Sequence, residues 1–354
     1  MKRSALSVIV VAAMLSSAPA QLPTEHPSSI LERYGPRADR SIDRALDFIA
    51  ARQLPNGSFE GTQGNTSAVV GLCGMAFLAQ GHVPGHGKYG HTLNRCVDRL
   101  IRSQSKTGYL AKPRGRPMYS HLAGTLFLLE ASGMVDATRQ AKLDALLPKA
   151  VNIVVAAQKV PKPAKFKGGW RYHPGSGDSD LSCSGWGVMV LRAARMNGMR
   201  VPDQAIDDAI AYVRRHELGR RGRFVYQAPG KRGSVTLTGV ALTCILLAGY
   251  DDDALMRRAS AFMLSEYEKI PSLGHPYYGL YYASQAMYHM GGKAWETFAP
   301  WMYDYWISRQ HPKTGGWIHP YQTAMVVLSF SLPYQQLPIY QRDIRPLRPA
   351  SNDP

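Results

Sequence analysis

One pattern recurs along the chain as Gln53-Leu-Pro-Asn-Gly-Ser-Phe59, Gln104-Ser-Lys-Thr-Gly-Tyr109, Gln158 with Gly168-Gly-Trp170, and Gln310-His-Pro-Lys-Thr-Gly-Gly-Trp317. A related turn, Gly222-Arg-Phe224, lacks the glutamine. The spacing is roughly fifty residues, with about two periods before the last segment. A second glycine series marks the ends of the segments that follow: Gly81, Gly133, Gly198, Gly249 and Gly291. Two interleaved series with one period indicate a structural unit that occurs six times.

Each unit is predicted to be a pair of helices joined by the Gly-aromatic turn. In the first unit, Ile42, Ala45, Leu46 and Ile49 follow the period of an amphipathic helix. Proline and glycine in the following turn end that helix. Residues 66–79 are apolar on nearly every side, which is typical of a buried helix. Every unit therefore supplies one half-exposed helix and one buried helix.

This alternation predicts an all-α fold, the α6/α6 toroid, in which six buried helices form an inner ring and six amphipathic helices surround it. The expected first helices begin near residues 41, 91, 138, 203, 253 and 293, and the second near 66, 119, 180, 234, 277 and 321. One toroid domain would span residues 38–332. An open solenoid of the same units is the alternative.

The first twenty residues have the order of features found in a signal peptide. Lys2 and Arg3 are followed by an apolar stretch from Ala5 to Leu15 and by Ala18-Pro19-Ala20 before Gln21. We therefore expect a protein exported to the periplasm or the extracellular space. No later apolar run reaches the roughly 18 residues that a transmembrane helix needs, so no transmembrane segment is expected.

The segments that flank the toroid are predicted to be irregular. Residues 21–37 would form a linker, and the Pro-rich residues 333–354 an extended tail that wraps the outside of the ring. The composition, with 45% hydrophobic residues and four Cys among 354, excludes a disordered chain and a disulfide-dense small scaffold.

The net charge of +17 bears on the choice of partners. An exported basic protein meets acidic polysaccharides and anionic lipid head groups more often than nucleic acid, so a nucleic-acid partner is not expected. The basic residues lie mostly in predicted loops, as Lys162, Lys165, Lys167, Arg220 and Arg221 do. A solvated surface without any partner is the alternative interpretation.

The repeat resembles the prenyltransferase and squalene cyclase repeat of the terpenoid cyclase and protein prenyltransferase superfamily. The resemblance rests on the four Gln-containing segments and covers roughly residues 38–332, although the fourth and fifth units lack the glutamine. It implies an α6/α6 toroid with a central cavity for an apolar or isoprenoid-type small molecule. A repeat of this kind specifies the fold better than the chemistry.

Signatures of three activities on this fold are incomplete in the sequence. The acid motif of squalene-hopene-type cyclases has its nearest match at Asp178-Ser-Asp180, with two of the three acids. The zinc pattern of protein prenyltransferases is approached by Asp180-Leu-Ser-Cys183 and His275, with one extra residue between Asp and Cys. The thioester motif is not matched, since Leu72-Cys73-Gly74-Met75-Ala76 lacks its Gln. No metal ion and no cofactor are therefore predicted.

Candidate site residues cluster at the starts of the predicted inner helices. Asp180, with Asp178 assisting, would be the catalytic acid, and the alternative is that either caps its helix. His121, Asp180 and His275 are expected to line one pocket. The complete set of cavity or ligand-binding candidates is His121, Cys183, Trp186, His275, Tyr277, Tyr278, Tyr281 and Tyr321.

The function that follows is an exported toroid that binds an extended, partly apolar ligand in its central cavity, and any reaction would be an acid-initiated cyclisation. One alternative is a non-catalytic scaffold for a protein or an acidic polymer. Another is a polysaccharide-active α/α toroid, which needs paired acids at one cleft. Glu130 lies deep in the second inner helix, so Asp180 has no evident acidic partner in the sequence.

Overall fold

The computed structural model describes residues 28–61, 66–112, 115–250 and 252–341. The predicted signal peptide and residues 342–354 lie outside the described residues. Twelve α-helices, and no β-strand, occur within the described ranges.

The helices alternate along the chain between two layers. The outer helices are α1 (Ser28–Ala51), α3 (Gly90–Ser103), α5 (Ala137–Lys159), α7 (Asp203–Arg214), α9 (Asp253–Glu266) and α11 (Gly292–Ile307). The inner helices are α2 (Ser67–Leu78), α4 (Pro117–Ala131), α6 (Leu181–Met196), α8 (Val235–Leu247), α10 (Pro276–Met290) and α12 (Pro320–Phe330). Nearly every residue of the inner layer is buried, as the apolar segments of the sequence predict.

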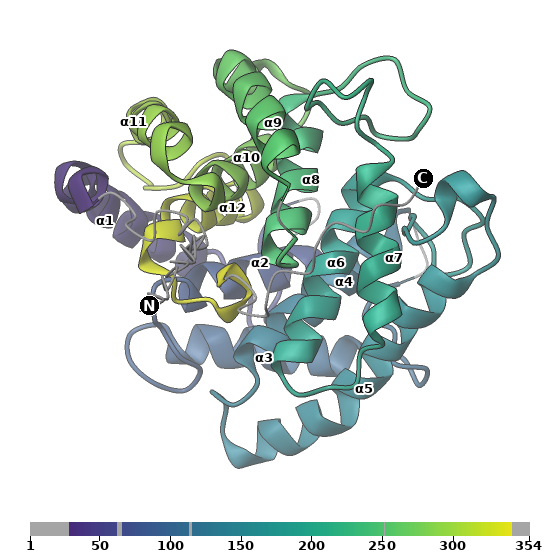
Figure 1. Ribbon diagram of the computed structural model, residues 1–354. Coiled ribbons are helices and arrows are strands. Elements are labelled where there is room, and N and C mark those ends of the chain that lie inside the picture. Colours follow the sequence, from purple (N-terminus) through teal and green to yellow (C-terminus); the bar gives the residue numbers. More distant parts are fainter. Residues whose placement is uncertain (1–27, 62–65, 113–114, 251, 342–354) are drawn as a thin grey trace, which may run out of the picture.

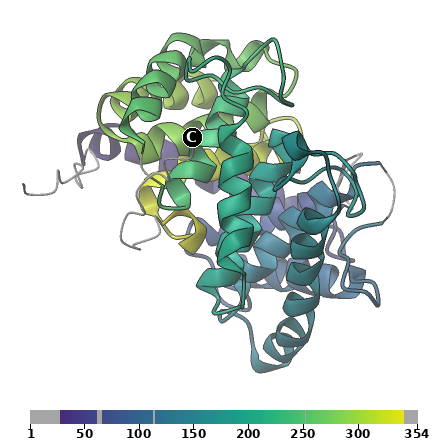
Figure 2. The same cartoon turned by 45° about the vertical axis from the view of Figure 1, so that its right-hand side comes forward.

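The inner helices form a closed ring. Each contacts the next one along the chain, and α12 packs against α2. In the outer layer, α1 packs against α11 in the same way. Figures 1 and 2 show the even-numbered helices surrounded by the odd-numbered ones. The all-α toroid is thus confirmed, and the contact of the last inner helix with the first contradicts the open solenoid.

The repeated glutamine fixes each turn to the next unit. The Gln158 amide donates to the carbonyl oxygens of Gly168 (2.9 Å) and Ala205 (2.7 Å), and thereby joins its own turn to the start of α7. Gln310 donates in the same way to Gly315 (2.6 Å) and to Ser41 (2.8 Å) in α1. Since Ser41 belongs to the first unit, the last glutamine of the pattern closes the ring.

The turn glycines are needed because the next outer helix passes directly over them. Gly168 has a φ of +90°, and a Cβ there would overlap the Asp208 carbonyl oxygen. Gly315 has a φ of +79°, and its Cβ would lie 2.6 Å from the Arg44 carbonyl oxygen. Only glycine combines this left-handed backbone with so close an approach.

The first helix begins earlier than the sequence predicts. The linker expected over residues 21–37 is wrong for residues 28–37, and so is the helix start near residue 41, because α1 begins at Ser28. Residues 21–27 lie outside the described residues. Ile30, Tyr34 and Ala38 are buried, and the Tyr34 ring stacks on Tyr303 with centroids 5.4 Å apart. This packing against α11 outweighs the cost of Pro36 within the helix.

The described part of the C-terminal tail does not wrap the outside of the ring. Residues 332–334 and 338–340 form 3₁₀ turns, and Leu337, Ile339 and Tyr340 are buried. Arg192 of α6 holds this segment by donating to the Ile339 (2.9 Å) and Gln341 (2.6 Å) carbonyl oxygens. The extended outer tail is therefore a wrong expectation for these residues. Burial of apolar side chains between the prolines provides the free energy that places them inside.

One of the basic loop residues is also buried. The Lys162 amine donates to the Ala157 (3.0 Å) and Gly169 (2.6 Å) carbonyl oxygens just beyond the end of α5. Burial lowers its pKa to about 8. Lys162 thus satisfies carbonyl groups that the helix end leaves free, and its charge is not part of the basic surface.

Candidate functional site

Asp180 lies at the start of α6, where it caps the helix and forms an ion pair. Its Oδ1 accepts the Cys183 N–H at 2.8 Å, which is the N-cap bond. Its Oδ2 accepts from the Arg171 guanidinium at 2.9 Å, and the carboxylate is fully buried. Burial raises the pKa of Asp180, and the donors of Cys183 and Arg171 oppose that rise.

Arg171 holds the loop groups around Asp180 together. Its Nε lies 3.2 Å from the Asp178 carboxylate, and its Nη1 donates to the Tyr226 hydroxyl at 2.8 Å. The guanidinium also covers the Tyr172 ring, 4.1 Å from the centroid. We call Arg171, Asp178, Asp180 and Tyr226 the Asp180 cluster. Arg171 directly follows the Gly168-Gly-Trp170 turn, and the repeat pattern alone does not single it out.

Hydroxyl groups join three inner helices beside the Asp180 cluster. The Ser182 hydroxyl contacts the hydroxyls of Tyr119 (3.0 Å) and Tyr278 (2.7 Å), which belong to α4 and α10. Burial raises the pKa of both phenols, so they are neutral at physiological pH. These groups are uncharged hydrogen-bonding positions at one end of the ring.

The two histidine candidates do not join Asp180 in one pocket. The His121 ring lies between the Leu110 N–H (3.2 Å) and the Ala150 carbonyl oxygen (3.0 Å), and so faces α5. Burial lowers its pKa to about 4. His275 precedes α10 and is exposed, without a side-chain capping bond. His121 is thus held by a loop and an outer helix, and His275 is exposed, so neither shares the buried surroundings of Asp180.

The remaining candidates are divided between the two sides of the inner ring. The Cys183 thiol donates to the Arg171 carbonyl oxygen at 3.1 Å and is fully buried. The Tyr277 ring packs on Trp306 of the outer helix α11, with centroids 5.0 Å apart, and Tyr321 is half-buried at the start of α12. Trp186, Tyr278 and Tyr281 lie together with inner-helix partners.

Two further properties hold for the described ranges. They contain no group of three or more His, Cys, Asp or Glu side chains arranged to hold a metal ion. None of their helices combines the length and apolar character that crossing a membrane requires.

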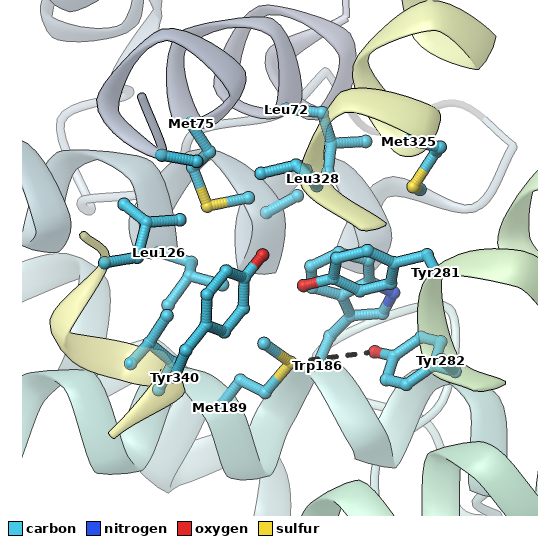
Figure 3. Close-up of a cluster of buried hydrophobic side chains, with 14 of the residues drawn as sticks. Leu72, Met75, Leu126, Trp186, Met189, Tyr281, Tyr282, Met325, Leu328 and Tyr340 are labelled. Carbon is cyan, nitrogen blue, oxygen red and sulfur yellow. Dashed lines mark hydrogen bonds between the residues drawn. The ribbon is translucent and has the colours of Figure 1, made fainter. Parts of the chain in front are cut away.

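Aromatic, thioether and aliphatic side chains point toward one another in the middle of the ring (Figure 3). Trp186 stacks on Tyr281, with centroids 5.7 Å apart and ring planes 7° apart. The Tyr282 hydroxyl lies 3.8 Å from the Met189 sulfur. The surrounding side chains come from the other inner helices and the tail: Leu72, Met75, Leu126, Met325, Leu328 and Tyr340.

Polar groups without partners occur beside this apolar set. The Tyr281 hydroxyl, both polar atoms of the Gln285 amide and the Tyr340 hydroxyl make no hydrogen bond of ordinary geometry within the described residues. The Tyr281 hydroxyl nevertheless lies near enough to Tyr340 and Gln285 for both to affect its pKa. All three side chains are buried. We call them the interior polar set. Glu130 lies close by, and its Oε2 accepts the Ile339 N–H at 3.3 Å. Unpaired polar groups are costly in a protein interior and call for a partner, such as a ligand or water.

Glu130 is expected to make stability depend on pH. Burial raises its pKa from about 4.5 to about 7, which the Ile339 N–H and Arg192 only partly oppose. Because the pKa is higher in the folded chain, the stabilising contribution of the neutral acid is present at low pH and is lost as the pH rises toward 7. Between pH 5 and pH 8 the loss is about 2–3 kcal/mol.

The matched variant is Glu130→Gln, which keeps an acceptor for Ile339 but does not titrate. Urea unfolding of both proteins is measured at pH 5 and at pH 8. Between these two pH values, the unfolding free energy of the parent should fall by about 2–3 kcal/mol more than that of Glu130→Gln. Equal pH dependence of the two proteins would show that Glu130 titrates normally.

Comparisons with known proteins find likeness only among solved structures. No protein-family model matches the chain, and no curated protein matches it. The type II terpene cyclase MstE from Scytonema, in its apo form, is 14% identical with a TM-score of 0.40, over 85% of this chain and 99% of that chain. A variant of MstE in complex with geranylgeranyl dihydroxybenzoate, its substrate, has the same identity and TM-score over 87% and 100%. These structures are similar to this chain in their helical arrangement, and no statement on its site is taken from them.

Proposed function

We propose that this protein binds an extended, largely apolar, isoprenoid-type ligand inside its ring. The observation that carries the proposal is the interior polar set, which lies unpaired among aromatic and apolar side chains. A ligand with a long apolar body and one polar group would contact both kinds of side chain. Within the described residues, the same polar atoms make no hydrogen bond of ordinary geometry that would offset their burial.

The chemistry of the lining favours an isoprenoid chain. Trp186, Tyr281 and Tyr282 offer ring faces and edges to methyl groups and double bonds. Met75, Met189 and Met325 contribute thioethers, which adapt their shape to a branched ligand. No fully charged side chain belongs to the set drawn in Figure 3.

Binding, without a reaction, is the function we propose. An acid that protonates an alkene must direct a free O–H at the substrate. Both carboxylate oxygens of Asp180 instead accept hydrogen bonds, from Cys183 and from Arg171. Catalysis by Asp180 and Asp178 stays a prediction, as does export of the protein.

Native mass spectrometry of the freshly isolated protein tests the proposal. We expect a non-covalent adduct that is lost on unfolding and that partitions into organic solvent. Heat-unfolded protein from the same preparation serves as the control for lipid carried over on the surface. Protein free of any adduct that instead binds acidic glycans on an array would contradict the proposal and favour a polysaccharide partner.

A further inference from the structure

The interior polar set is built from two separate parts of the chain. Tyr281 and Gln285 are one helical turn apart on α10, so their side chains lie on the same face. Tyr340 comes from the C-terminal segment, and its hydroxyl points toward that of Tyr281 (Figure 3). Burial raises the pKa of both phenols, and the charge of Glu130 adds to the rise. The nearby Tyr340 and Gln285 side chains oppose it at Tyr281, whereas Tyr281 raises the pKa of Tyr340 further.

The position of Tyr340 is fixed from both sides by inner helices. Its neighbour Ile339 donates through N–H to Glu130 of α4 and accepts through its carbonyl from Arg192 of α6. Its other neighbour, Gln341, accepts from the second nitrogen of Arg192. Three hydrogen bonds on the two neighbouring residues therefore hold Tyr340 in the interior.

We infer that Tyr281, Gln285 and Tyr340 form a subsite for one uncharged oxygen, a hydroxyl or a carbonyl, at the end of an isoprenoid-type ligand. This inference rests on the proposed function and names the chemical class of its ligand. Two phenols and a carboxamide offer both donors and acceptors but no net charge. A hydroxyl or carbonyl oxygen can be satisfied by such groups, whereas a carboxylate or diphosphate needs a counter-charge.

The charged groups nearby are already engaged elsewhere. Arg192 keeps its positive charge, but its Nη1 and Nη2 donate to two backbone carbonyl oxygens of the tail. Glu130 acts on both phenols of the set, and burial raises its pKa to about 7 against the opposing effects of the Ile339 N–H and Arg192. An anionic head group beside Glu130 would repel its ionised form and raise the cost of burying both.

Calorimetric titration with three probes that share one chain tests the inference: farnesene, farnesol and farnesyl diphosphate. We expect farnesol to bind the full chain at least about tenfold more tightly than farnesene, since a subsite built for an oxygen leaves its groups unpaired by a hydrocarbon. Farnesyl diphosphate should bind more weakly than farnesol. Farnesene binding as tightly as farnesol, or the diphosphate binding most tightly, would overturn the inference while leaving the proposed function intact.

Two substitutions locate the effect. Gln285→Met and Tyr340→Phe each remove polar atoms with little change of volume, and each should reduce the preference for farnesol over farnesene about fivefold or more. Tyr303→Phe is the matched control, because its hydroxyl bonds to Phe330 between α11 and α12 and should not affect the preference. An unchanged preference in both variants, with unfolding temperatures near that of the parent, would also overturn the subsite. If none of the three probes binds the parent protein, the proposed function itself fails.

Discussion

Replacing Asp180 by alanine is expected to lower the free energy of unfolding by about 3–4 kcal/mol. The substitution removes the N-cap bond to Cys183, which contributes about 1 kcal/mol. It also removes the buried partner of Arg171, and breaking such a pair costs several kcal/mol because the remaining charge is poorly compensated. The second contact of Arg171 with Asp178 limits the loss. Urea unfolding of parent and variant gives the value directly.

Asp180→Asn separates the cap from the charge. Asparagine caps helices well, so this variant should keep the bond to Cys183 and lose about 1–2 kcal/mol through the weaker contact with Arg171. The control is Asp178→Asn. Because the Asp178 carboxylate is 40% exposed, this variant should lose less unfolding free energy than Asp180→Asn. Unaltered stability of Asp180→Ala would show that the buried ion pair is not formed. Loss of ligand binding in a stable Asp180→Asn protein would instead support the predicted functional role.

Tyr340→Ala is expected to destabilise the protein by about 3–5 kcal/mol, the usual cost of emptying a buried aromatic site. The ring contributes to the apolar middle of the toroid, and its removal leaves a cavity among Leu126, Met189 and Tyr281. Binding of a dye that reports exposed apolar surface should rise at the same time, because the buried Tyr340 ring no longer covers its apolar neighbours.

Tyr340→Phe is the matched comparison for that loss. It removes only a hydroxyl that has no hydrogen-bond partner among the described residues, so stability should stay within about 0.5 kcal/mol or rise slightly. If Tyr340→Ala is as stable as Tyr340→Phe, the C-terminal segment does not occupy the interior.

The fold could be predicted from the sequence because the repeated residues each make a contact that every unit needs. The glutamines of the pattern join neighbouring units, and the turn glycines lie where an outer helix leaves no room for a Cβ. Such local requirements recur in every unit and are therefore visible as a period. The early start of α1 was not predictable in this way, because it depends on packing of Tyr34 against α11 at the far end of the chain.

The site could be predicted only in part. The acidic residue before an apolar segment correctly indicated a cap at Asp180, but its partners Arg171 and Tyr226 lie on loops that converge only in the closed ring. The sequence positions of His121 and His275 predict only that they lie near helix starts. Because successive helical residues are rotated by about 100°, being near a helix start does not determine which side a residue faces.

Three buried polar residues of the inner helices are visible in the sequence beside the interior polar set or within it. Glu130, Arg192 and Gln285 are polar residues within otherwise apolar inner helices, and such residues are rarely buried without a partner. Glu130 and Arg192 bind Ile339 and Gln341 of the tail. These contacts could not be predicted, because the tail lies far away in the sequence and outside the repeated helices.

A crystal structure of the protein with bromine-labelled farnesol tests the central claim most directly. We expect the farnesol chain inside the ring against Trp186 and Tyr281, with its oxygen near Gln285 and Tyr340, and the anomalous signal of bromine marking the chain. Bromine peaks found only on the outer helices, with the interior unchanged, would contradict the account.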